Sequence, residues 1–210
     1  MPESFVSPVD IANMALSHVG AKSAIESLDE KTAEATQARI WYDYSRRVVL
    51  EAHNWHFARK RVTLALHGDT ISETSTDPMA GVWGFRYQYP PDCLVARKIQ
   101  NPNAPPDDAV PFTVEGSLDG KEKTILTSME DAVLVYTWNL ENTDMFSSLF
   151  VLAMSHLLAH HVAYSLTGSR RIKVDELKIF QGLVPLATGV DANEGVDPPP
   201  RDTDWIRARQ

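Results

Sequence analysis

The chain of 210 residues contains a single cysteine, Cys93. One cysteine excludes an intramolecular disulfide and any zinc site built from several cysteines. No activating motif surrounds Cys93, so we interpret it as a small, half-buried strand residue. The N-terminus also lacks a basic and then apolar signal peptide, and we therefore expect synthesis in a reducing cytoplasm.

Basic residues are outnumbered by acidic ones. The sequence has 28 Asp and Glu residues against 20 Lys and Arg, a formal net charge of -8. Proteins that coat DNA normally have a basic surplus, so this balance argues against that class. It is compatible with a protein that DNA slides past, because a negative wall repels phosphate.

Motifs for catalysis are missing as well. The ten glycines form no phosphate-binding loop or dinucleotide fingerprint, and no serine lies in a Gly-x-Ser-x-Gly turn. The acidic pairs Asp107-Asp108 and Glu130-Asp131 stand beside turns, which is typical of solvated surface. We predict no catalytic residue, no metal and no cofactor.

Only one long apolar run is present, from Met145 to Leu166. It is long enough to span a bilayer, but it contains several serines and histidines and lacks flanking aromatic belts. We therefore predict a core helix within a bundle and no contact with a membrane.

Start and stop signals predict four helices. The first begins with Ser7 as cap and Pro8 at the first helical position, and it ends at Gly20. Ser27 to Glu30 form a capping box that predicts a long helix from about Asp29 to Asn54. Two further helices are expected at about 145–167, ending at Gly168, and at about 172–187.

The middle of the chain contains short strands separated by turns, which predicts a small antiparallel sheet or barrel. The fold class is therefore α+β: an antiparallel helical bundle from 1–69 and 140–188, with a β subdomain inserted at 70–139. The strand-like segments are Val62–Leu66, Trp83–Tyr89, Cys93–Ile99, Pro111–Glu115, Thr124–Thr127 and Val133–Trp138.

Residues 189–210 have the composition of an extended arm. The stretch from Gly189 to Pro200 is rich in glycine and proline, which argues against a helix or a central strand. Trp205, Ile206 and Arg207 follow this stretch. A large apolar pair at the tip favours an arm that docks on a partner over a terminus without a role.

Two histidine pairs have helical spacing. His53 and His56 are three residues apart, and His156 and His160 are four apart, so each pair can share a helix face. The alternative function that this suggests is a metal-dependent or lytic enzyme. The metalloprotease glutamate is missing, since Leu157 follows His156, and we favour structural roles for these rings.

A basic cluster lies among aromatic residues in the first third of the chain. It comprises Arg46, Arg47, Arg59, Lys60 and Arg61. Such a patch can bind nucleic acid, but the acidic total and the predicted helical context favour an electrostatic contact with another subunit or a partner. Trp41, Tyr44, Val48 and Trp55 are expected to pack the bundle core.

The order of these segments resembles the tail tubular protein A family, the head-to-tail adaptors of short-tailed bacteriophages and of prophages. The resemblance covers most of the chain, to about Ala187. No single motif identifies the family, but the order and spacing of the motifs together are specific to it. They are ALSHVGA (15–21), IESLDE (25–30), Tyr42, Arg46-Arg47, WHFAR (55–59), YQYPPDCL (87–94) and LAHHVAYSLT (158–167).

The resemblance implies a structural virion protein of the phage neck, made in the bacterial host cytoplasm. Members of the family form a ring, which is dodecameric in the family, between the portal protein and a tail nozzle. The resemblance implies that the ring extends the DNA channel and that DNA passes through it without specific binding. In related adaptors a C-terminal extension grips the portal. The acidic, proline-rich ending of this chain departs from the shared pattern.

Overall fold

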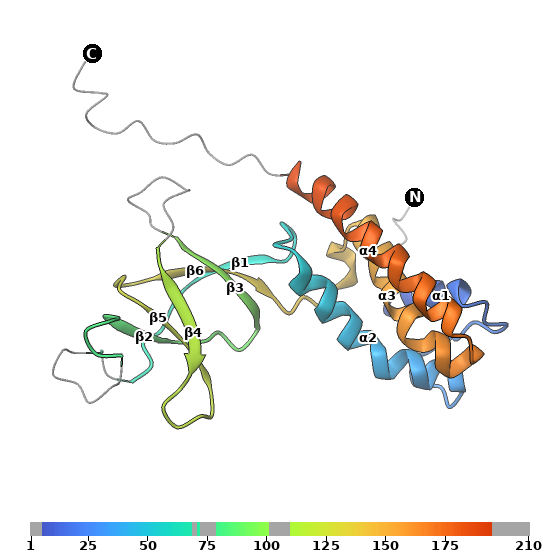
Figure 1. Ribbon diagram of the computed structural model, residues 1–210, viewed down its shortest axis with the longest axis horizontal. Coiled ribbons are helices and arrows are strands. Elements are labelled where there is room, and N and C mark those ends of the chain that lie inside the picture. Colours follow the sequence, from blue (N-terminus) through green and yellow to red (C-terminus); the bar gives the residue numbers. More distant parts are fainter. Residues whose placement is uncertain (1–5, 69–70, 72–78, 101–109, 195–210) are drawn as a thin grey trace, which may run out of the picture. The chain divides into compact units, whose positions relative to one another are not determined.

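The computed structural model describes residues 6–68, 71, 79–100 and 110–194. In these residues it contains four α-helices and two three-stranded antiparallel sheets, so the α+β prediction is confirmed (Figure 1). Contacts divide the chain into a helical unit, up to Ala58 and from Asn139 to Glu194, and a β unit from Arg59 to Trp138. Each unit has a hydrophobic core of its own.

Helix α1 (Pro8–His18) begins as the sequence predicts. The Ser7 hydroxyl accepts a hydrogen bond from the Asp10 N–H at 3.1 Å, and the Asp10 carboxylate accepts one from the Ser7 N–H at 2.9 Å. Gly20 has a φ of 73°, which glycine adopts without a steric penalty, and the chain leaves the helix there.

Helix α2 (Ala33–Ala52) begins later than predicted. Its cap is Thr32, whose hydroxyl accepts from the Ala35 N–H at 3.2 Å. The predicted capping box exists as a separate turn, in which the Glu30 carboxylate accepts from the Ser27 N–H at 2.8 Å. The serine and glutamate pattern predicted a helix start because an isolated turn closed by these two residues uses the same hydrogen bonds as a capped helix.

Helix α3 (Ser148–Thr167) follows a short 3-10 turn (Thr143–Met145) and occupies the centre of the helical unit. It packs against α1, α2 and the last helix. Its length and apolar composition would also suit a membrane span, but 61% of the apolar window is buried inside the unit. A buried core helix can have the same length and apolar composition, so these two properties give only weak support for a membrane span.

Helix α4 (Arg170–Ala192) is longer than predicted and corrects the start of the arm. It runs through Gly182, Pro185 and Gly189, which are poor helix formers, and ends at Ala192. The prediction that the chain is non-helical from Gly189 is therefore wrong. Tertiary contacts override propensity here, because Asp191 is 3% exposed and bonded to another segment of the helical unit.

The β unit consists of two sheets with strand orders β1-β6-β3 and β2-β5-β4. All neighbouring strands are antiparallel, and β3 is irregular opposite β6. The basic segment that begins at Arg59 belongs to β1 rather than to the helices. The strands are β1 (Arg59–Thr63), β2 (Phe85–Gln88), β3 (Cys93–Gln100), β4 (Phe112–Gly116), β5 (Lys123–Thr127) and β6 (Val133–Trp138).

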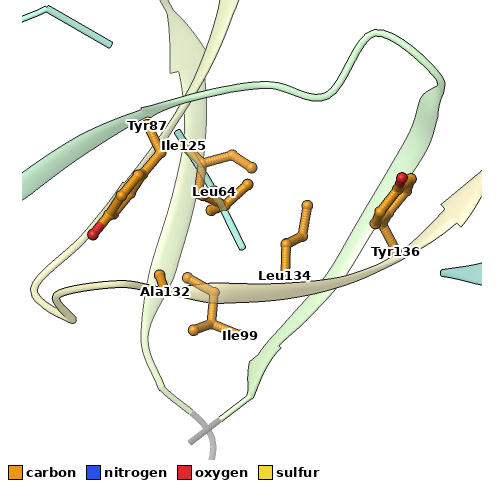
Figure 2. Packing of buried hydrophobic residues seen from close by; sticks show 7 residues of the cluster. All are labelled: Leu64, Tyr87, Ile99, Ile125, Ala132, Leu134 and Tyr136. Atoms are coloured by element: carbon orange, nitrogen blue, oxygen red, sulfur yellow. The ribbon is translucent and has the colours of Figure 1, made fainter. Parts of the chain in front are cut away.

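One cluster of buried side chains joins the two sheets of the β unit (Figure 2). Tyr87 and Ile125 come from one sheet, and Leu134 and Ile99 come from the other. The Tyr87 hydroxyl donates to the Met129 carbonyl at 2.9 Å, so its polar end is satisfied. Alternation along each strand places these residues on the inner faces.

Candidate functional site

The two histidine pairs predicted as possible metal ligands lie at different places in the helical unit and have different partners. His156 lies in the core of the helical unit, where its Nδ1 is 2.6 Å from a carboxylate oxygen of Glu176 on α4. The His18 ring stacks on the His156 ring at a centroid distance of 3.9 Å. Burial lowers the pKa of His18, and the neighbouring His156 lowers this pKa further. The stacked rings and the bond to Glu176 fasten α1, α3 and α4 together.

The second pair lies at the other end of α4. The Asp191 carboxylate accepts from the backbone N–H of His56 at 3.0 Å and contacts the His56 Nδ1 at 2.9 Å. The His53 Nε2 is 3.5 Å from the same carboxylate. Asp191 thus ties the end of α4 to the segment after α2, with its oxygens already used by N–H donors.

These two sites cannot share a metal ion. Glu176 and Asp191 are fifteen residues apart on α4, a separation of about 22 Å along a helix. His160 binds elsewhere, with its Nδ1 2.7 Å from the Lys173 carbonyl oxygen. Within the described part of the chain, no group of three His, Cys, Asp or Glu side chains could hold a metal.

His161 contributes to an aromatic cluster at the surface of the helical unit. Its ring stacks on Trp41 at 4.5 Å between centroids, and Tyr44 meets both rings edge-on. Burial lowers the pKa of His161 to about 4, with further lowering by His160 and Lys173. Tyr44 is nevertheless 53% exposed, so the prediction that it packs in the core is wrong, whereas Trp55 is fully buried as expected.

Arg46 is an internal residue of the helical unit. Its side chain is 1% exposed, and its guanidinium donates to the Leu140 carbonyl at 2.5 Å and to the Asn139 side-chain oxygen at 3.0 Å. It also lies 3.3 Å from Asp43. These bonds account for Arg46 inside its own unit, so it does not present a charge at the surface.

The other basic residues are divided between the two units. Arg47 lies exposed on α2, whereas Arg59, Lys60 and Arg61 form the start of β1. Lys60 is paired with Asp92 at 2.8 Å and lies 3.5 Å above the Trp138 ring. Arg61 is exposed. The basic cluster of the sequence is therefore not one continuous patch on one element.

Asp92 is the partner that holds Lys60 in place. Burial alone would raise the pKa of Asp92, but hydrogen bonds from Lys60 and from the Tyr136 hydroxyl outweigh it and lower this pKa. Next to it, burial raises the pKa of the Cys93 thiol to about 11. A thiol with such a pKa is a poor nucleophile, in agreement with its interpretation as a half-buried strand residue.

Large apolar side chains are exposed on every helix of the helical unit, including Met14 on α1 and Tyr164 on α3, and two groups of them lie on α2 and α4. On α2 they are Ile40, at 56%, and Tyr44, which we call the α2 face. On α4, Ile179, Leu186 and Val190 are 43%, 56% and 46% exposed. Together with Gly182 and Gly189 on the same side of the helix, they form what we call the α4 stripe.

The β unit contains an apolar pocket of about 300 Å³. Its lining is Trp83, Val110, Pro111, Ser128 and Met129. Ser128 supplies the polar side chain of this set, and none of the five is ionisable. The pocket suits an apolar side chain of a partner better than a reaction.

Sequence reasoning missed the acidic partners of the histidines and the α4 stripe. Asp191 stands in a stretch whose glycines and prolines predict an arm, and Glu176 is one of several acids on α4. The signal for the stripe was present, since Ile179, Leu186 and Val190 recur at helical spacing. Trp205, Ile206 and Arg207 of the predicted arm lie outside the described residues.

We compared the sequence with protein-family models and with curated proteins. No protein-family model matches the chain, and no curated protein matches it. The functional interpretation therefore depends on the sequence motifs and on the geometry of the two units.

Proposed function

We propose that this protein is a structural head-to-tail adaptor of a short-tailed phage or prophage, rather than an enzyme. Copies would form a ring, of about twelve by analogy with the family it resembles, between the portal and the tail nozzle. DNA would pass through this ring without specific binding. The observation that carries the proposal is the order of the motifs along the chain, from ALSHVGA at residues 15–21 to LAHHVAYSLT at residues 158–167.

Exposed apolar surface on the helical unit supports an assembled state. Ile40, Tyr44 and Leu186 are each more than half exposed. Single apolar residues are normal at a surface, but the α2 face and the α4 stripe repeat along a helix. Burying them between copies would remove this area from water.

Charge supports the passage of DNA. A net charge of -8 per copy, repeated around a ring, repels the phosphate backbone and prevents it from sticking. A ring also adds many weak contacts to one partner, so its total binding exceeds that of one copy. The arm would be the segment that docks on the portal, through Trp205, Ile206 and Arg207.

Light scattering tests the proposal most directly. The mass of the purified protein is measured alone and after mixing with the cognate portal protein. We expect a complex that holds a fixed multiple of copies near twelve per portal ring. A protein that stays single and ignores the portal contradicts the proposal, and metal analysis of the preparation would then test the enzyme alternative.

A shortened chain tests the arm. Removal of the residues after Glu194 leaves every described contact in place, so we expect a folded protein that no longer binds the portal in a pull-down. Trp205→Ala with Ile206→Ala in the full chain should give the same loss. Binding at the full-length level by both variants would disprove the role of the arm.

A further inference from the structure

One side of helix α4 is left uncovered by the part of the chain that the structure describes. Among the described helices it packs chiefly on α3, which leaves the opposite side open. That side carries the α4 stripe, with Ile179, Leu186 and Val190 exposed. A Cβ atom added at Gly182 or Gly189 would meet nothing within 4 Å, so neither glycine is required by packing inside the chain.

We propose that the α4 stripe of one copy packs on the α2 face of the next copy, with Tyr44 seated over Gly182. This names the contact between neighbours in the proposed ring and rests on that function. The occupant is a second copy of this chain because the complementary surface lies on the same unit.

The α2 face has the properties of an anchor. Tyr44 is 53% exposed, yet its ring is held by edge contacts to Trp41 at 5.8 Å and to His161 at 5.5 Å. An exposed aromatic ring that is already fixed loses little conformational entropy on binding, as at interface hot spots. A glycine opposite such a ring leaves a hole that the ring can fill.

Tyr44 and Gly182 also lie at similar distances from the starts of their own helices. In Figure 1, α2 and α4 run in the same direction, from lower right to upper left, against α3. Tyr44 lies eleven residues after Ala33, and Gly182 lies twelve after Arg170. At 1.5 Å per residue these are heights of about 16 and 18 Å above the helix starts. Rotation about an axis parallel to the helices preserves such heights between copies.

Charges at the helix starts are complementary. Arg170, Arg171 and Lys173 give α4 a basic first turn, which its own dipole disfavours, and Arg171 is 92% exposed. The first turn of α2 contains Glu34, and Asp29 before the helix is 90% exposed with Arg39 of α2 at 3.8 Å. Further along, the exposed Arg47 of α2 would lie beside a stretch of α4 that has no Lys or Arg after Lys178.

Two different surfaces on one copy produce a head-to-tail contact. Such a contact closes into a ring or continues as a filament, whereas a contact of α4 with α4 would stop at a dimer. An α4 pair would also leave Ile40 and Tyr44 uncovered. The geometry therefore favours the head-to-tail arrangement.

Cross-linking between two variants, each with one introduced cysteine and with the native Cys93 replaced by serine, tests the contact. Tyr44→Cys and Gly182→Cys proteins are mixed in the assembled state, alone or on the portal, and treated with a short bismaleimide. We expect a covalent dimer from the mixture and none from either variant alone. The matched control replaces Gly182→Cys by Gln181→Cys, turned about 100° around the same helix, and should give at least fivefold less dimer.

A second variant separates assembly from folding. Gly182→Leu improves the helix propensity of α4, and its Cβ would meet no atom of the described residues within 4 Å. We expect an unchanged or higher melting temperature together with at least tenfold weaker self-association, whereas Gln181→Leu should assemble normally.

The outcomes distinguish this inference from the proposed function. Assembly into several copies without the mixed dimer, or with normal assembly of Gly182→Leu, overturns the contact and leaves the adaptor proposal intact. A mixed dimer in a protein that ignores the portal supports the contact and contradicts the adaptor. A protein that remains single under both conditions contradicts both.

Discussion

Arg46 and Arg47 are neighbours in sequence with different environments. Arg46 is enclosed and bonded to the Leu140 carbonyl, and Arg47 is exposed. In a helix, adjacent residues point about 100° apart, so one can face the core while the next faces solvent. The pair therefore offers an internal comparison of a buried and a surface charge.

We expect Arg46→Ala to lower the free energy of unfolding by about 2–4 kcal/mol, because it removes buried donors from the Leu140 carbonyl and from Asn139. Arg47→Ala should change it by no more than about 0.5 kcal/mol. Urea unfolding followed by circular dichroism measures both. Equal effects of the two variants would show that the buried bonds add nothing.

His161 makes the stability of the helical unit depend on pH. Its pKa is about 4 in the folded chain, against 6.5 for the free side chain. The unfolded chain therefore takes up the proton first as the pH falls. Stability from this group is complete above about pH 6.5 and is lost progressively down to about pH 4.

We expect His161→Phe to flatten this dependence, since phenylalanine keeps the stack on Trp41 and takes up no proton. The difference between pH 7 and pH 4 should shrink by roughly 1–2 kcal/mol, because solvent screens part of the effect at a half-buried ring. Melting temperatures across this range, with His67→Phe in the β unit as control, measure it. A parallel loss in wild type and His161→Phe would assign the acid sensitivity to other groups.

Most helices and strands could be predicted from local signals. Ser7, Gly20 and Gly168 mark the helix ends where the structure has them, and all six predicted strand segments overlap strands in the β unit. These signals work because capping and turn chemistry depend on neighbouring residues. The strand at the start of the β unit begins earlier than predicted, at Arg59, where pairing with Thr137 decides the backbone conformation.

The end of α4 could not be predicted in the same way. Gly182, Pro185 and Gly189 all disfavour a helix, and contacts with distant segments, among them the bond between Asp191 and His56, explain why it continues. The acidic partners of the histidines were hidden for the same reason. Contacts between distant segments leave no periodic pattern in the sequence.

Two truncations at the end of α4 test this explanation. A chain that stops after Glu194 should keep the stability of the full protein, whereas one that stops after Thr188 should lose about 1–3 kcal/mol, because the His56 N–H is left without its acceptor. Asp191→Ala in the full chain should reproduce the loss. Thermal unfolding of the three proteins measures this loss. If the chain that stops after Thr188 is as stable as the full protein, Asp191 is dispensable.

The whole molecule is built from two units with separate cores. The cluster around Tyr87, Ile125 and Leu134 lies entirely within the β unit, and the described residues before Arg59 and after Trp138 form the helical unit. An inserted unit with its own core can fold alone when its ends are supported by its own strands. Here β1 and β6, the first and last strands, pair with each other.

We therefore expect a fragment of residues 59–138 to fold by itself. Its stability should be about 3–5 kcal/mol, as for a single core of this size, with a cooperative urea transition and a dispersed amide NMR spectrum. Ile125→Asp, which places a charge in the core, should abolish both signals. A fragment without a cooperative transition would show that the β unit depends on the helices.

The bond between His56 and Asp191 also sets an order of events during protein synthesis. The ribosome makes His56 early and Asp191 near the end, and at 5–20 residues per second the delay is about 7–27 s. The β unit is made within that interval before α3, so α1 and α2 first lack the helix that packs on both of them. A nascent chain thus exposes its first two helices until α3 can pack on them, which makes them a natural target of chaperones and proteases during that time.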